Sequence, residues 1–297
     1  MGELIVEARN LTYRYPTSKE NTLDGMNLHV VAGRKLALLG GNGSGKTTLL
    51  LHLNGTLRPR EGVVLLDGQP GRYDAAGLVA WRRTVGLVLQ EPDDQLFAAT
   101  VAEDVSFGPL NLGLPVDETM SRVADAMEAL GISSLAARPP HLLSHGQRKR
   151  AAIAGIVAVR PPVLVLDEPT AGLDHPGQKH LLSCLSRLNA AGATIVFSTH
   201  DVDLAYDWAD DVAIFVKGCV AAQGEATSIL SDAALLALAR LRTPVMTTLR
   251  NAGVPVPQGL RNVEKWPKQD GLNATGPKKE LSGDHLFDRP ARMNVTK

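Results

Sequence analysis

Short apolar runs recur along the chain and alternate with segments of helical periodicity. Residues 35–39, 163–166 and 193–199 form such runs, and each is short enough to be a single strand. Nearly continuous apolar runs of this length are typical of parallel strands that are covered on both faces. The pattern therefore predicts an α/β fold built around a parallel sheet.

Two stretches depart from this alternation. Strand-like segments near 4–6, 28–31 and 63–66 predict an antiparallel β edge subdomain. Between about 91 and 158 the chain is amphipathic, for example over 116–130. This stretch predicts an α-helical subdomain inserted into the α/β core.

The predicted strand at 35–39 leads into a glycine-rich loop and then into an apolar helical segment. The loop consists of Gly40, Gly41, Asn42, Gly43, Ser44, Gly45, Lys46, Thr47 and Thr48. Glycines permit positive φ, so backbone N–H groups can turn inward where the following helix directs its positive end. In this phosphate-binding pattern Lys46 would reach the β- and γ-phosphates of a nucleotide, and Thr47 would hold Mg²⁺. The alternative is an ordinary strand–turn–helix loop.

Two carboxylates, Asp167 and Glu168, follow the apolar run 163–166. A buried parallel strand would deliver both to the carboxyl edge of the sheet, where ligands bind in open α/β folds. Asp167 could hold Mg²⁺ through water, and Glu168 could polarise the water that attacks the γ-phosphate. The alternative, two acids that only solvate a strand end, is disfavoured by the glycine loop.

Residues 143–147, which read Leu-Ser-His-Gly-Gln, resemble the signature peptide of the ATP-binding cassette (ABC) family. Further elements of that family occur in order around it: Tyr15, Gln90, the segment 171–174 and His200. The resemblance implies a P-loop NTPase (RecA-like) core with the antiparallel edge and the inserted helical subdomain. It also implies an enzyme that binds and hydrolyses ATP with Mg²⁺.

The resemblance implies a role for each of these residues. Tyr15 would stack on adenine, Gln90 would touch Mg²⁺ or water, and His200 would contact the γ-phosphate and help to position the water held by Glu168. Taken alone, Tyr15 could be an ordinary strand residue and His200 a structural hydrogen-bonding residue. Asp174 could make a cross-subunit contact or cap the next helix.

The signature segment also has a physical interpretation of its own. Ser144 is a good N-cap and residues 148–159 lack proline, so a helix should begin here. Ser144, Gly146 and Gln147 offer a hydroxyl, close backbone approach and free N–H groups, which suit a terminal phosphate. In the ABC family that phosphate belongs to ATP on the opposite subunit, so the resemblance implies a homodimer. His145 departs from the commoner glycine.

Residues 90–104 narrow the resemblance within the family. Together with 51–55, 143–150 and 199–204 they resemble the energy-coupling-factor (ECF) ATPases, and among these the CbiO-type ATPases of cobalt importers. The resemblance implies an energy-coupling subunit that is peripheral to the cytoplasmic face of the cell membrane and bound to transmembrane subunits of a cobalt importer. The carboxylates of 91–104 would attract arginines of such a subunit, unless they form a merely solvated loop. Nickel, biotin or another vitamin remain alternative substrates.

Composition limits the classes of partner. Lys plus Arg and Asp plus Glu both total 31, so there is no electrostatic reason to expect a nucleic acid. The two cysteines form no Cys-x-x-Cys pair, which suits a reducing cytosol. No stretch reaches 18 uninterrupted apolar residues, so a membrane role would require a partner. The scattered histidines suggest no cobalt site, so we expect selectivity to reside in the membrane subunits.

Two other classes within the ABC family fit the sequence less well. A chromosome or repair ATPase would need a long coiled-coil insertion between Lys46 and Asp167. A translation-associated ABC protein, which acts on nucleic acid or ribosomes, usually carries two cassettes.

We expect one ABC ATPase domain at 3–240 and a short helical C-terminal extension at 241–257 that helps dimerisation. Residues 258–297, rich in proline, glycine and charge, are expected to form a flexible tail.

Overall fold

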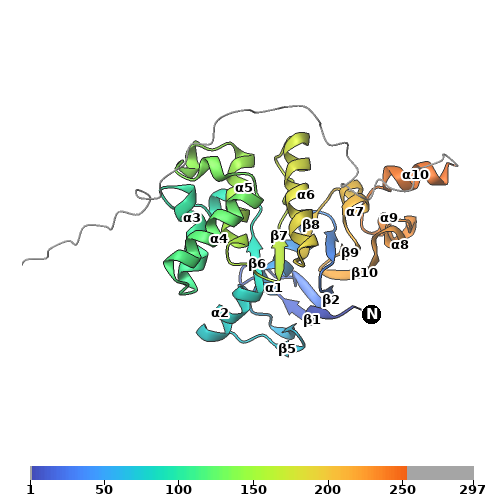
Figure 1. The fold of residues 1–297 in the computed structure, drawn as a ribbon. Coiled ribbons are helices and arrows are strands. Elements are labelled where there is room, and N and C mark those ends of the chain that lie inside the picture. The colour runs from blue at the N-terminus through green and yellow to red at the C-terminus, as the bar shows by residue number, and fades with distance from the viewer. Residues whose placement is uncertain (1, 253–297) are drawn as a thin grey trace, which may run out of the picture. The chain divides into compact units, whose positions relative to one another are not determined.

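The computed structural model describes residues 2–252 and contains two β-sheets (Figure 1). The larger sheet has the order β10-β9-β3-β8-β7-β6. Its strands are β3 (Lys35–Leu39), β6 (Val85–Val88), β7 (Val163–Leu166), β8 (Thr194–Thr199), β9 (Asp211–Val216) and β10 (Cys219–Glu225). All neighbours pair in parallel except β10, which joins β9 antiparallel. The parallel sheet predicted from the apolar runs is confirmed.

The smaller sheet is antiparallel and has the order β2-β1-β4-β5. Its strands are β1 (Leu4–Tyr13), β2 (Leu23–Val31), β4 (Glu61–Leu66) and β5 (Gln69–Pro70). It is tied to the larger sheet where Gln223 of β10 accepts a hydrogen bond from the backbone N–H of His29 on β2, at 3.1 Å. The antiparallel edge expected from the sequence is therefore present.

The apolar run of residues 36–39 lies in the strand β3, which is covered on both faces. Successive side chains of a strand point to opposite faces of its sheet. Leu36 and Leu38 pack into a core shared with the antiparallel sheet, whereas Ala37 and Leu39 pack into a core shared with helices of the other face. All four are buried, so β3 separates two hydrophobic cores and leads from between them into the glycine loop.

Ten helices lie within residues 2–252. They are α1 (Lys46–Leu53), α2 (Ala75–Thr84), α3 (Val101–Asn111), α4 (Val116–Ala129), α5 (His145–Val157), α6 (His175–Ala190), α7 (Val202–Trp208), α8 (Ala226–Ile229), α9 (Ala233–Leu238) and α10 (Val245–Asn251). Short 3₁₀ turns occur at Pro92–Asp94, Ser133–Leu135 and Pro140–Leu142. No helix of this part of the chain is long and apolar enough to cross a membrane.

Helices α3, α4 and α5 lie between β6 and β7 in the chain and gather together in Figure 1. The sequence determines where two of them begin. Thr100 forms a capping box with Glu103 at the start of α3, and Ser144 forms one with Gln147 at the start of α5. The α/β fold class with an inserted helical part, predicted from the sequence, is confirmed.

The chain after α9 contains one more helix, α10, as the sequence suggested for the segment after Pro244. It is joined to α7 of the same chain, where the backbone N–H of Val245 donates to Asp203 at 2.7 Å. Residues 253–257 of the predicted extension and the predicted tail 258–297 lie outside the described residues. A role of α10 in dimerisation stays a prediction.

Candidate functional site

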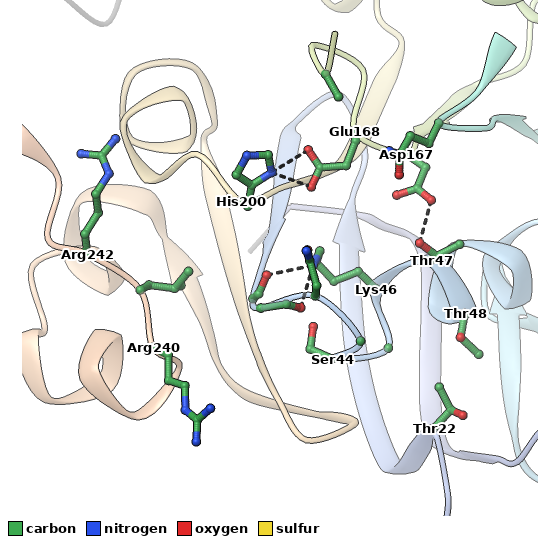
Figure 2. A pocket seen from close by; sticks show the side chains of 18 residues that line it. Thr22, Ser44, Lys46, Thr47, Thr48, Asp167, Glu168, His200, Arg240 and Arg242 are labelled. Carbon is green, nitrogen blue, oxygen red and sulfur yellow. Dashed lines mark hydrogen bonds and ion pairs between the residues drawn. The ribbon is translucent and has the colours of Figure 1, made fainter. Parts of the chain in front are cut away.

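A cavity of about 840 Å³ lies where the central parallel strands end. Figure 2 shows its side chains converging from the glycine loop and from the ends of β7 and β8. Its lining includes residues predicted from the sequence: all nine of the loop 40–48, Gln90, Asp167, Glu168 and His200. The lining also includes Ala171, the first residue of the predicted segment 171–174, and four residues that the sequence did not place in the site: Thr22, Arg240, Leu241 and Arg242.

The glycine loop owes its shape to positions where no larger side chain fits. Gly45 is the N-cap of α1 with φ of 105°, and a Cβ there would lie 2.8 Å from the carbonyl oxygen of Thr22. The first N–H groups of α1 have no acceptor within the helix, so they and the helix dipole favour an anion. The hydroxyl of Ser44 is buried with no hydrogen-bond partner within residues 2–252. These donors fit the phosphates of a nucleotide.

Lys46 projects from the first turn of α1 toward the loop. Its Nζ donates to the carbonyl oxygens of Gly40 at 2.8 Å and of Gly41 at 3.1 Å. An ammonium carries three donors, so one is left for a ligand in the cavity. Burial lowers the pKa of Lys46, and the nearby carboxylates of Glu168 and Asp167 offset part of this effect.

The hydroxyl of Thr47 donates to Oδ2 of Asp167 at 2.7 Å. Two adjacent oxygen groups of this kind fit a hard cation such as Mg²⁺. The hydroxyl of Ser198, on β8, donates to Oδ1 of Asp167 and accepts the backbone N–H of Glu168 at 2.8 Å. Ser198 thus joins β8 to both acidic residues after β7. The signal in the sequence that could have revealed it is a hydroxyl residue that directly follows the apolar run of residues 195–197 at the end of the strand.

Glu168 and His200 lie in contact with each other at the cavity (Figure 2). Nδ1 of His200 lies 3.1 Å from one carboxylate oxygen of Glu168 and 3.2 Å from the other. Because a carboxylate only accepts, Nδ1 must carry the proton and donate. The side chain of His200 is 69% exposed and that of Glu168 is 12% exposed, so the histidine is open to solvent while the carboxylate is largely covered.

A buried lysine of the signature helix helps to hold Glu168. Nζ of Lys149 donates to the backbone oxygens of Glu168 at 2.9 Å and Ala171 at 3.1 Å. Glu168 has φ of 43°, a left-handed conformation that is uncommon for a residue with a side chain. Burial lowers the pKa of Lys149, and carboxylates led by Glu91 partly oppose this. Lys149 fixes the turn that presents the carboxylate.

The signature residues lie in a second cavity of about 430 Å³. Ser144 begins α5 as expected, and its hydroxyl accepts the backbone N–H of Gln147 at 3.3 Å. Asp174 caps α6 by accepting the N–H of Gly177 at 3.0 Å, and it lines the same cavity as Ser144 and Gly146. Within one chain, the structure does not bring these residues together with the phosphate loop.

Tyr15 lines neither of these cavities. Its hydroxyl lies 3.2 Å from that of Thr48, and its ring meets Tyr13 edge to face. The stacking of Tyr15 on adenine stays a prediction.

The comparison with known proteins identifies the family. A family model described as ABC transporter matches residues 23–171. The cobalt import ATP-binding protein CbiO of Rhodobacter capsulatus is 58% identical over 245 residues, which cover 82% of this chain and 87% of that protein. The chain belongs to the ABC transporter family. It is an ABC ATPase of the energy-coupling-factor type, because the transporter ATP-binding protein EcfA of Methanocaldococcus jannaschii is also 46% identical, over 89% of this chain and 99% of that one.

Solved structures agree with this assignment. CbiO1 of Clostridium perfringens, described as part of the ABC transporter complex CbiONQ, is 39% identical with a TM-score of 0.72, over 84% of this chain and 99% of that chain. The ATP-binding cassette MJ0796, described as a dimer bound to ADP and phosphate, is 27% identical with a TM-score of 0.68. The match covers 75% of this chain and 99% of that chain. The chain therefore has the fold and the ATPase activity of ABC proteins.

Proposed function

We propose that this ABC ATPase is the ATP-hydrolysing subunit of an ECF-type importer for cobalt ions. The observation that carries the proposal is the 58% identity to the cobalt import protein of Rhodobacter capsulatus over 82% of the chain. The subunit would work as a homodimer, peripheral to the cytoplasmic face of the membrane and bound to transmembrane subunits. Importers of nickel, biotin or another vitamin are the alternatives that the experiment below separates.

The residues that line the cavity could take separate roles in ATP hydrolysis, which supports the proposal. The loop 40–48 and Lys46 would bind the β- and γ-phosphates, while Thr47, Asp167 and Gln90 would hold Mg²⁺. When bound, the ion would neutralise phosphate charge. Glu168 would accept a proton from the attacking water, since its carboxylate is nearly buried and held by its backbone. His200, which contacts that carboxylate, would help to position the water.

The separation of the two cavities supports a homodimer. Lys46 lines one cavity, and Ser144, Gly146 and Asp174 line another. If the signature residues bind a terminal phosphate, that phosphate must come from a second copy of the chain. Two copies would then form two composite sites, consistent with the dimeric form of MJ0796.

The acidic segment 91–104 supports docking on a membrane subunit. Fewer of its carboxylates are available to bind a partner than the sequence suggested. Asp93 lies 2.9 Å from Nε of Arg148 on α5. Asp104 accepts two backbone N–H groups, and Glu103 completes the cap of α3. These three acids have partners within the chain, so the expectation that all the acids attract a partner's arginines is too broad.

Asp94 is exposed and forms no ion pair within residues 2–252. Close to it in the chain, Phe97 is 66% exposed and meets Phe107 edge to face at 4.7 Å between ring centroids. An exposed pair of aromatic rings next to an acid suits an interface with apolar and basic groups. We therefore assign Asp94, Phe97 and Phe107 to the docking surface.

The test is uptake of radiolabelled Co²⁺ by cells that contain the full complex. Wild-type complex should accumulate Co²⁺, and the Glu168→Gln complex should not, because the variant keeps the shape of the site and loses the base. Excess unlabelled Ni²⁺ or biotin should compete weakly. Uptake that is unaffected by Glu168→Gln, or preferential transport of nickel or a vitamin, would refute the cobalt assignment and leave the ATPase assignment standing.

A further inference from the structure

The segment between α9 and α10 forms one wall of the nucleotide cavity, although it belongs to none of the ABC motifs. Arg240, Leu241 and Arg242 line the cavity together with the phosphate loop. Figure 2 shows this segment across the cavity from Lys46. This segment thus forms the wall of the cavity that faces the place where the phosphates would bind.

Contacts to α7 fix the position of this segment. Arg242 pairs with Asp203 at 2.5 Å and with Asp201 at 3.4 Å. Asp201 directly follows His200, so the segment is tied to the side of the cavity where His200 meets Glu168. That side is the one proposed to receive the terminal phosphate.

Arg240 occupies a backbone position where glycine would be the favoured residue. It is the left-handed residue of a Schellman motif after α9, with φ of 56°. The motif is complete, because the N–H of Arg240 donates to Ala237 at 3.0 Å and that of Leu241 donates to Leu236 at 2.8 Å. A residue with a Cβ is strained here, whereas glycine is not. The arginine therefore has no advantage for the turn itself.

Charge indicates what the arginine offers instead. The cavity presents two carboxylates, Asp167 and Glu168, to a ligand that is itself strongly anionic. Arg242 is neutralised by its two aspartates, whereas Arg240 is exposed and forms no ion pair within the described part of the chain. A guanidinium on a long side chain can turn into the cavity, and its donor fork matches phosphate oxygens.

We propose that Arg240 is a further nucleotide-binding residue, which donates hydrogen bonds to the terminal phosphate of ATP held by the loop 40–48 of the same chain. The inference rests on the proposed phosphate site. It makes the segment that leads into α10 sensitive to whether the nucleotide carries two phosphates or three.

The test compares the affinities of the full-length chain for a non-hydrolysable ATP analogue and for ADP, both with Mg²⁺. Arg240→Gly should weaken binding of the analogue roughly ten-fold and that of ADP by about two-fold or less, as expected for loss of a charge-assisted contact to the third phosphate. The thermal midpoint of unfolding should stay the same or rise, because glycine suits the turn. Arg240→Lys should retain part of the discrimination.

Arg160→Gly is the matched control. Arg160 also has a left-handed backbone, with φ of 58°, but pairs with Asp125 and does not line the nucleotide cavity. This variant should leave both affinities unchanged. An unchanged ratio of analogue to ADP affinity in a folded Arg240→Gly protein would overturn the proposal for Arg240. Unchanged binding in Lys46→Ala would instead overturn the phosphate site on which the proposal rests.

Discussion

Buried polar side chains determine where the carboxylates of Asp167 and Glu168 lie. Ser198 joins the two acidic residues to the neighbouring strand, and Lys149 holds the backbone of Glu168 from the signature helix. Each satisfies groups that would otherwise be left buried and unpaired, which is costly. The carboxylates are thus positioned by side chains that need not touch the nucleotide.

His52, on α1, makes the free energy of unfolding of the chain depend on pH. It is fully buried, its Nδ1 donates to the carbonyl oxygen of Thr48 at 2.7 Å, and its Nε2 has no partner within residues 2–252. Burial lowers its pKa below the ordinary 6.5. On acidification the unfolded chain therefore takes up the proton first, and stability is lost as pH falls through 6.5.

Replacing His52 by Gln should remove this pH dependence. Between pH 7.5 and 5.5 the wild-type chain should lose up to about 1.4 kcal/mol more free energy of unfolding than His52→Gln does. Urea denaturation of both proteins at the two pH values measures the difference. Other titrating groups are common to both proteins, so equal losses would show that His52 is not the source.

The grouping of the loop 40–48 with Asp167 and Glu168 in one cavity could be predicted because their spacing and residue types are themselves the signal. The loop 40–48 and the acids after 163–166 follow apolar runs and need no knowledge of distant contacts. Lys149 and Arg240 could not be found in this way. Lys149 acts on a turn formed later in the chain, and Arg240 lines the same cavity as the loop in a segment that Arg242 ties to α7.

Among the elements, the pairing of α5 with the turn Pro92–Asp94 connects the signature helix to the proposed docking surface. Asp93 of the turn lies 2.9 Å from Arg148 of α5. Arg148 is 22% exposed and Asp93 is 67% exposed, so the pair is partly screened and adds little to stability. We expect its importance to be positional, because the contact joins the turn to the helix that carries Ser144.

Asp93→Lys should lower the ATPase activity of the isolated chain about two- to five-fold, the effect of replacing a modest attraction by a repulsion. The exchanged pair Asp93→Arg with Arg148→Asp should restore much of the activity. Asp94→Lys should leave the isolated activity unchanged and reduce copurification with the membrane subunits. Steady-state phosphate release and pull-down assays make these measurements. Equal losses in Asp93→Lys and Asp94→Lys would contradict a specific role of the Arg148 contact.

Some elements, such as the strands β3, β7 and β8 and the helix α4, were predicted from periodicity, whereas their order in space was not. β8 lies between β3 and β7 although it is the last of the three in the chain. Short helices such as α8 and α9 span too few residues to show a period. Their positions follow from packing against the helix-covered core, which includes Leu230 and Leu236.

For the molecule as a whole, a dimer with composite sites makes a quantitative prediction. Lys46→Ala and Ser144→Arg chains should each be nearly inactive alone. In a mixed dimer both lesions fall in one site and the other site is intact. Random mixing at equal amounts makes half of the dimers mixed, so ATPase activity should return to about a quarter of the wild-type value.

The control for this experiment mixes Lys46→Ala chains with chains that carry both substitutions, where no intact site can form and no activity should return. Recovery in the control, or a fully active monomer established by sedimentation, would contradict composite sites. A composite site cannot be recognised in a single chain, because Ser144 and Lys46 lie in different cavities. Only the resemblance to the ABC family indicated it.

The alternation along β3 has a consequence for cooperativity. Leu36 and Leu38 belong to one core, and Ala37 and Leu39 to the other. Melting either core would expose half of the strand and remove the support of its neighbours in the sheet, so neither core can be lost while the other persists. Because β3 continues into the phosphate loop, the geometry of the loop survives as long as both cores do and disappears with either.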